Sequence, residues 1–389
     1  MSGTCAAVVE AYKILQCSGR EKNGAMRVNN ERAYWVAWRQ LQGVGPVGIK
    51  ALHEHFGSLE TAWRASPMEL QAVSKWGELK VQNVAPQRNR CDPFKILERF
   101  EKAFPPFWTP ADPDYPPLLR EIPDLPTMLF YRGKPLSHWP PTVAIVGTRK
   151  PTEYGRTWTK KIAQALSRAG CLIVSGLALG IDGEAHQATL DAGGLTTAVL
   201  GSSLEAISPP THTALAGRIA RVAPLLSEYP PGTETIPTNF PCRNRIVVGM
   251  SMATILIEAP ERSGALISAH LACEYNRDLY VLPGSLGVEQ SVGALKLIQQ
   301  GARPILSVEG LLNDLGLAVV PTGQNLEIPI GLPDEEAALL NLLGNGSQSF
   351  DELVAKTGLA TGELASQLLM MELKGLIAQE AGLRYARRW

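Results

Sequence analysis

Short apolar runs between residues 142 and 282 constrain the fold more than any other feature of the sequence. Five of them are rich in Val, Ile, Leu or Ala, and they read TVAIV, CLIVS, TTAVL, ATILIEA and DLYVL. Longer segments with helical spacing separate most of these runs, for instance GRTWTKKIAQALSRAG between the first two. Continuous apolar strands joined by helical crossovers are typical of a parallel sheet covered on both faces. The sequence therefore predicts a Rossmann-like, doubly wound α/β domain with a mostly parallel sheet.

The patterns on either side of the apolar runs predict further units. We assign residues 104–316 to the extended Rossmann-like domain. Residues 31–103 have apolar positions at helical spacing around the turn GVGPVG, which predicts a helical domain of SAM or helix-hairpin-helix type. Residues 1–30 are polar and weakly periodic, so we expect a disordered tail there. Residues 317–333 have the composition of a linker, and 334–389 show three helices and a two-stranded hairpin, the pattern of a winged helix.

Proline is dense between residues 104 and 141, in FPPFWTPADPDYPPLLREIPDLP. It lacks a backbone N–H group and disrupts helices and central strands. We therefore expect this stretch to be an extended connector.

Charge and cysteine usage limit the classes of function. Lys plus Arg and Asp plus Glu both number 37, so nucleic-acid binding requires a local basic surface. The six cysteines form no C-x-x-C pair, and His186 and His270 lack metal-ligand spacing, so we expect neither a metal site nor a disulfide. There is no apolar stretch of about 18 residues and no signal-peptide core, so we expect a cytoplasmic protein without membrane contact.

Glycines and small hydroxyl residues follow four of the predicted strands. These positions are Gly147-Thr148-Arg149, Ser175-Gly176, Gly201-Ser202-Ser203 and Pro283-Gly284-Ser285. In an open parallel sheet, ligands bind beyond the carboxyl ends of the strands, where helix N-termini present backbone N–H groups. Glycine lets the backbone approach a phosphate, and Arg149 can bind one in bidentate fashion. Each glycine alone could simply turn a strand into a helix, but four such loops with an arginine favour a phosphate-bearing ligand.

The type of ligand is narrowed by the absence of two motifs. Neither G-x-G-x-x-G nor a P-loop lysine motif is present, so NAD and ATP are poor candidates and no cofactor is expected.

A second segment combines aromatic and basic side chains. Residues 239–251, NFPCRNRIVVGMS, place Phe240, Arg243, Asn244 and Arg245 close together. Aromatic rings beside guanidinium groups are what single-strand binders use to stack bases and hold phosphates. The alternative is a helix start with a core Phe and solvated arginines.

The α/β part resembles the DprA/Smf family of DNA-processing proteins. The resemblance rests on VAIVGTRKPTEYG, SGLALGIDGEAH, AVLGSSLEAISPP, TNFPCRNRIVVG, ERSGALISAHLACE and LPGSLGVEQSVGALKLIQQGA, which follow in family order over about half of the chain. It implies a non-enzymatic accessory protein of natural transformation that binds and protects incoming single-stranded DNA, dimerises and helps to load a RecA-type recombinase. Gly147, Thr148 and Arg149 fall on the family's phosphate-binding turn, and Phe240 to Arg245 on its DNA-contacting segment.

The sequence departs from the family pattern at three positions. Leu179 and Cys242 stand where a basic residue is common, and Leu295 where Asn is usual. Each phosphate that a protein neutralises adds separately to affinity, so fewer basic groups should weaken binding.

Two other classes of function remain open on the sequence. A nucleotide phosphoribohydrolase of the lysine-decarboxylase-like family would have a related architecture, with Glu258, Glu261 or Glu274 as the catalytic carboxylate, but its P-G-G-x-G-T signature is missing.

The second class is a duplex-DNA regulator. It would bind phosphate through the backbone amides around Gly43, Gly45 and Gly48 and would read DNA with the winged helix. Its recognition-helix candidate, TGELASQLLMMELKG, carries Lys374 as its one basic residue, and this indicates packing rather than DNA reading. Arg384, Arg387 and Arg388 could contact DNA weakly.

Overall fold

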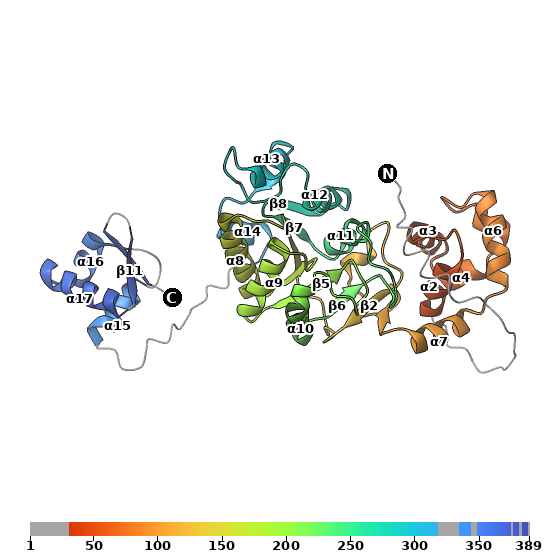
Figure 1. The fold of residues 1–389 in the computed structure, drawn as a ribbon, viewed down its shortest axis with the longest axis horizontal. Coiled ribbons are helices and arrows are strands. Elements are labelled where there is room, and N and C mark those ends of the chain that lie inside the picture. Colours follow the sequence, from red (N-terminus) through yellow and green to blue (C-terminus); the bar gives the residue numbers. More distant parts are fainter. Residues whose placement is uncertain (1–30, 318–333, 344–347, 375, 381–382, 388–389) are drawn as a thin grey trace. The chain divides into compact units, whose positions relative to one another are not determined.

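The computed structural model describes residues 31–317, 334–343, 348–374, 376–380 and 383–387, which form two compact units (Figure 1). The expected tail at 1–30 and the linker, apart from residue 317, lie outside the described residues. Among the described helices, none combines the length and apolar character that a membrane span needs.

A nine-stranded sheet forms the centre of the first unit, in the order β1-β2-β6-β5-β4-β3-β7-β8-β9. Its strands are β1 (Phe107–Trp108), β2 (Leu129–Arg132), β3 (Thr142–Val146), β4 (Leu172–Ser175), β5 (Leu195–Leu200), β6 (Leu225–Ser227), β7 (Ala253–Leu256), β8 (Asp278–Val281) and β9 (Arg303–Pro304). All neighbours in the series β6-β5-β4-β3-β7-β8-β9 pair in parallel. At one edge of the sheet, β2 pairs antiparallel with β6, and β1 pairs antiparallel with β2. The predicted doubly wound, mostly parallel sheet is therefore confirmed.

The prediction for the proline-rich stretch is wrong in part. Residues 104–141 contribute β1 and β2, and β2 pairs with β6 through Phe130 and Ser227. Tyr115 from the same stretch is fully buried, and its hydroxyl donates to Pro126 O at 2.8 Å. The prolines are tolerated because they lie in the segments around β1 and β2, and neither strand contains one, so no hydrogen bond of the ladder is lost.

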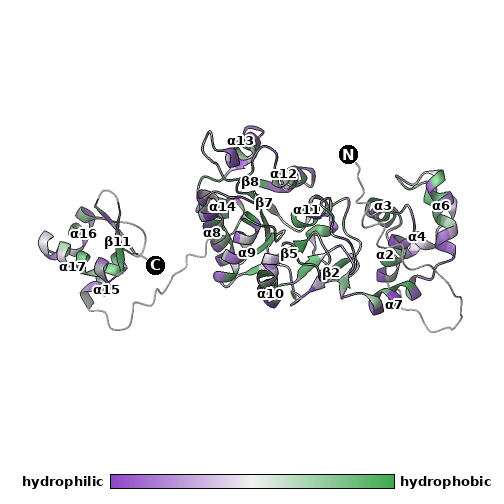
Figure 2. Ribbon diagram, in the orientation of Figure 1, coloured by the Kyte–Doolittle hydropathy of each residue, from purple (hydrophilic) through white to green (hydrophobic). Residues whose placement is uncertain are grey.

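Seven helices accompany the parallel strands. They are α8 (Glu153–Arg168), α9 (Ile181–Asp191), α10 (Thr213–Val222), α11 (Asn239–Gly249), α12 (Gly264–Glu274), α13 (Val292–Gln299) and α14 (Val308–Asp314). Along β3, Val143 and Ile145 pack in one apolar cluster with residues of α8, α9 and α14, whereas Ala144 and Val146 pack in another with residues of α11, α12 and α13. Both faces of the sheet are thus covered, and the central strands are mainly hydrophobic in Figure 2.

Six helices precede the sheet, as the helical spacing predicted. They are α2 (Glu31–Gln40), α3 (Pro46–Phe56), α4 (Leu59–Arg64), α5 (Pro67–Gln71), α6 (Glu78–Asn89) and α7 (Pro93–Ala103). Trp38 lies at their centre, with ring centroids 5.0 Å from Trp63 and 5.5 Å from Trp76. Polar contacts join these helices to the edge of the sheet: Arg32 Nη1 lies 2.9 Å from Asp112 Oδ1, and Lys50 Nζ donates to Glu121 O at 2.6 Å.

The second unit has the predicted winged-helix order. Three helices are followed by a hairpin, and the hairpin and a short strand between the first two helices form a sheet in the order β10-β12-β11. The elements are α15 (Asp334–Leu342), β10 (Gln348–Ser349), α16 (Phe350–Thr357), α17 (Thr361–Leu373), β11 (Ile377–Glu380) and β12 (Arg384–Arg387). Its core includes Leu353, Leu368 and Met371.

Candidate nucleic-acid interface

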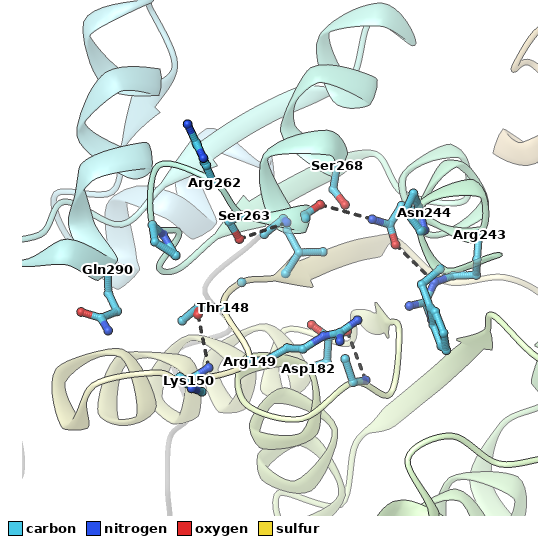
Figure 3. A pocket seen from close by; sticks show the side chains of 18 of the residues that line it. Thr148, Arg149, Lys150, Asp182, Arg243, Asn244, Arg262, Ser263, Ser268 and Gln290 are labelled. Atoms are coloured by element: carbon cyan, nitrogen blue, oxygen red, sulfur yellow. Dashed lines mark hydrogen bonds between the residues drawn. The ribbon is translucent and has the colours of Figure 1, made fainter. Parts of the chain in front are cut away.

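The direction of the chain across the sheet reverses between β3 and β7. The chain runs from β3 through β4 and β5 to β6 on one side, and then from β7 through β8 to β9 on the other. Loops at the carboxyl ends of β3 and β7 therefore diverge and leave a crevice, which is where open α/β sheets bind ligands. A pocket of about 530 Å³ lies at this switch point (Figure 3). Its wall includes residues 147–150 after β3, Pro260 and residues 262–265 after β7, and Phe240 and Asn244 from α11.

The predicted phosphate turn forms one side of this pocket. Thr148 N donates to Glu258 O at 2.7 Å, and Ile181 N donates to Thr148 O at 3.2 Å, so the turn is held from both neighbouring loops. A Cβ atom at Gly147 would lie 2.6 Å from Ile181 Cγ1, which explains why this position needs glycine. Arg149 and Lys150 are exposed and line the pocket. The turn thus presents two cationic side chains on a fixed backbone.

Phe240 lies beside Arg149. The guanidinium carbon of Arg149 is 5.8 Å from the centroid of the Phe240 ring. The ring is half-buried and lines both the large pocket and a smaller one of about 90 Å³, which Leu179 and Pro209 also line. An aromatic face and a guanidinium are therefore adjacent, and both reach solvent.

The structure corrects the assignment of Arg243 as a phosphate ligand. Arg243 is 4% exposed, and its Nη1 donates to Gly176 O at 2.5 Å and to Val199 O. Its Nε donates to Asn244 Oδ1 at 3.3 Å. Burial lowers the pKa of Arg243, an effect that the nearby carboxylate of Asp182 opposes. Arg243 lines the pocket but mainly ties α11 to the ends of β4 and β5.

Arg245 lies in an internal ion pair, so its assignment to the DNA site is also wrong. Its Nη2 is 2.5 Å from Glu228 Oε2, and its Nε is 3.5 Å from Asp124 Oδ2. The side chains of Arg245 and Glu228 are 12% and 7% exposed. This cluster joins α11 to β6 and to the segment before β2.

Three further predicted site residues serve the scaffold. Ser175 is fully buried and donates to Ile145 O at 2.6 Å, so its hydroxyl is unavailable to a ligand. Gly176 borders the smaller pocket, and its N–H donates to Asp182 Oδ2 at 3.0 Å. At Gly201, a Cβ atom would lie 2.7 Å from Phe240 Cδ1, so this glycine makes room for the ring.

Several pocket residues were not predicted from the sequence. They are Lys150, Asp182, Arg262, Ser263, Ser268 and Gln290. Arg262 is exposed, and Ser263 caps α12 by accepting from Ala265 N at 3.2 Å. Burial raises the pKa of the Asp182 carboxyl, although Arg243 and the N–H groups of Ala178 and Gly176 oppose this rise. The run Arg-Ser-Gly at the start of α12 was the available signal, because it combines a cation with a helix start.

The carboxylates of the enzyme hypothesis are engaged elsewhere or exposed. Glu258 is 3% exposed and accepts from Thr152 N at 2.9 Å and from the Thr152 hydroxyl. Glu261 pairs with Lys296, and Glu274 is exposed at the end of α12. Glu258 thus anchors the start of α8 to the end of β7. His186 packs on β5 through Thr196, with 2.6 Å between Nδ1 and Oγ1.

The fold and the switch-point pocket define the class: a doubly wound α/β protein with a pocket lined by cationic side chains at the carboxyl edge of its sheet. Residues 106–316 match the family described as DNA recombination-mediator protein A, and residues 327–382 match the DprA winged helix domain. The chain therefore belongs to the DprA/Smf family.

Individual relatives agree with this assignment. Protein Smf of Synechocystis sp. is 43% identical over 92% of this chain and 100% of its own length. The DNA processing protein DprA of Streptococcus pneumoniae is 40% identical over 57% of this chain and 78% of its own. The X-ray structure of the Streptococcus pneumoniae protein superposes with a TM-score of 0.60 and 32% identity over 74% of this chain and 99% of that one.

Proposed function

We propose that the switch-point pocket binds single-stranded DNA. The observation that carries this proposal is the convergence of Arg149, Lys150 and Arg262 with the ring of Phe240 around one pocket of about 530 Å³. Cations that track the backbone, next to an aromatic face that stacks a base, are the combination used by single-strand binders. The neutral net charge of the chain is no obstacle, because these cations come from two loops that meet at one place.

Each pocket residue has a distinct part in this proposal. Arg149 and Lys150 neutralise backbone phosphates on one side, and Arg262 with the N-terminus of α12 does so on the other. Phe240 stacks a base, and the cation–π contact with Arg149 keeps the guanidinium near that base. Asn244, whose amide lies 3.5 Å from Gly264 O, borders the same space. Arg243 acts indirectly, by holding the loops.

We further propose that the protein mediates recombination without catalysis, as a homodimer that protects single-stranded DNA and assists a RecA-type recombinase in natural transformation. The description of the family as a recombination mediator supports this role. The buried and paired state of Glu258 argues against phosphoribohydrolase chemistry, because a general base must reach its substrate. The exposed Leu369 and Met370 on α17 argue against a duplex reader.

Titration of labelled oligonucleotides tests the proposal. Single-stranded and duplex forms are titrated at several salt concentrations, together with an assay for base release from nucleoside monophosphates. We expect tighter binding of the single strand, an affinity that falls with salt, and no base release. A preference for duplex DNA, or measurable base release, would show that the proposal is wrong.

A further inference from the structure

One face of α8 carries aromatic and cationic side chains outside the pocket. Tyr154, Trp158 and Lys161 stand at positions i, i+4 and i+7, which places them along one side of a helix. The ring centroids of Tyr154 and Trp158 lie 6.2 Å apart, and Lys161 Nζ lies 5.1 Å from the centroid of Trp158. Tyr154 is 46% exposed, Trp158 is half-buried and Lys161 is exposed. We call these three residues the α8 stripe.

The α8 stripe begins at the rim of the pocket. The loop that enters α8 contains Lys150, which lines the pocket. The hydroxyl of Tyr154 donates to Pro283 O at 2.9 Å, and the loop that starts at Pro283 continues to Gln290 on the pocket wall. In Figure 3, Lys150 and Gln290 lie on the same side of the pocket, away from Arg243 and Asn244. We therefore expect a DNA strand that leaves the pocket between Lys150 and Gln290 to reach the α8 stripe next.

The charge of α8 suits a polyanion. The helix holds four basic residues against one acidic residue, although the whole chain is neutral. Arg156 and Lys160 are directed to Glu184 on α9, at 2.5 and 3.8 Å. Lys161 instead lies over the ring of Trp158. Lys161 therefore lies beside Trp158, the largest aromatic side chain of the α8 stripe.

We propose that the α8 stripe is a second contact for single-stranded DNA, a stacking platform for the segment that leaves the pocket past Lys150. Trp158 stacks a base and Lys161 neutralises a neighbouring phosphate, because base–aromatic stacking next to a cation binds any sequence. This inference rests on the proposed function of the pocket. It predicts that the stripe matters for strands long enough to reach it, whereas Arg149 matters at every length.

A length series tests the proposal with the full chain. Oligothymidylates of about 4 to about 16 nucleotides, the range of known single-strand site sizes, are titrated at several salt concentrations. Trp158→Ala should weaken binding of the long oligonucleotides on the order of tenfold, the loss of one stacked base, and should leave the shortest unaffected. Lys161→Gln should reduce the salt slope for long strands by about 0.7. Arg149→Ala should weaken binding at all lengths.

Two matched variants serve as controls. Lys160→Gln removes the same charge from the same helix, but on the side directed to Glu184, and should leave the salt slope for long strands unchanged. Trp158→Phe keeps an aromatic face and should bind nearly as the parent does. Because Trp158 also packs against the apolar core, thermal melts check each fold. If Trp158→Ala does not fold, two other measurements decide. One is the salt slope of Lys161→Gln with long strands. The other is tryptophan fluorescence: long strands should quench the signal of Trp158 in the parent, and this part of the quenching should be absent in Trp158→Phe.

The outcomes separate the two proposals. If the stripe variants bind like the parent at every length while Arg149→Ala binds weakly, the pocket stands and the α8 stripe does not. If the parent binds no single strand at any length, the pocket proposal fails and the stripe fails with it. If Trp158→Ala instead shifts the sedimentation of DNA-free protein and leaves the length dependence unchanged, the α8 stripe is a contact between copies and the inference is wrong.

Discussion

Arg149 and Phe240 lie side by side, but they should contribute to DNA binding through different forces. The guanidinium acts by displacing counterions from phosphate, which is a salt-dependent contribution that is nearly independent of sequence. The ring acts by stacking, which requires no charge. The two contributions are therefore separable by substitution.

Arg149→Ala should lower the affinity for all single-stranded sequences and reduce the salt slope by about 0.7. Phe240→Ala should cost about 1 to 3 kcal/mol of binding free energy and leave the slope unchanged. Titrations over a range of salt concentrations measure both quantities, and Lys134→Ala, an exposed cation in the turn after β2, is the control. Binding by Arg149→Ala that equals the parent at every salt concentration would refute the phosphate role of this turn.

His186 gives the protein a pH dependence that is unrelated to DNA. The Thr196 hydroxyl donates to Ile173 O at 2.9 Å, so it must accept from His186 Nδ1–H, and the ring is held as that neutral tautomer. Burial, with smaller effects from His212 and Arg243, lowers the pKa of His186 to about 3. In the unfolded chain, histidine titrates near 6.5, so between these values the unfolded state binds the extra proton.

The free energy of unfolding should therefore fall as the pH falls below about 6.5, by up to about 1.4 kcal/mol per pH unit from this group. Above that pH, the contribution of His186 is complete. His186→Asn, whose amide can still donate to Thr196, should have a shallower dependence in the same window. Denaturant unfolding between pH 7.5 and 5 provides the measurement, and equal slopes for parent and variant would contradict the assignment.

At the scale of elements, α11 shows why part of the site could not be predicted from the sequence. Phe240, Arg243 and Arg245 are close in the chain, but α11 begins at Asn239, and each residue of a helix turns by about 100° from the one before. Arg243 and Arg245 are therefore about 200° apart around the axis and cannot both face one pocket. The sequence pattern predicts one cluster, but a helix brings Phe240, Arg243 and Asn244 to the pocket and turns Arg245 away from it.

This geometry changes what Arg245→Ala should do. Removing one member of a buried ion pair leaves Glu228 uncompensated, which costs about 3 to 5 kcal/mol. We expect a lower melting temperature and, for the protein that remains folded, a salt slope of DNA binding equal to that of the parent. Thermal melts and salt titrations measure both quantities. A smaller salt slope of DNA binding at an unchanged melting temperature would contradict this prediction and place Arg245 in the DNA site.

The strands were predictable where they are central in the sheet and apolar. All five predicted runs form strands, β3, β4, β5, β7 and β8, because central parallel strands need continuous apolar sequence. The missed strands β1, β2, β6 and β9 have two to four residues; β1 and β6 each follow a proline directly, and β9 includes one. Their pairing depends on neighbours far away in the chain, as between Phe130 and Ser227, so local patterns do not reveal it.

At the scale of the whole molecule, the flanking units are predicted to be dispensable for binding single strands. The fragment 104–316 contains every loop of the pocket and should fold and bind. It lacks Arg32 and Lys50, whose contacts with Asp112 and Glu121 hold the edge of the sheet, so it should melt at a lower temperature than the fragment 31–316. Melts and titrations of both fragments test this. A fragment 104–316 that is folded but inactive would mean that the helical unit supplies part of the site.

The edge strand β9 limits how copies of this protein can associate. Its two residues, Arg303 and Pro304, are exposed, and Pro304 offers no N–H group to an incoming strand. Sheets that grow by strand addition need an unbroken row of donors and acceptors, and this edge interrupts that row. The homodimer proposed above should therefore not form by continuing the sheet at β9, which closes one route to open-ended polymers.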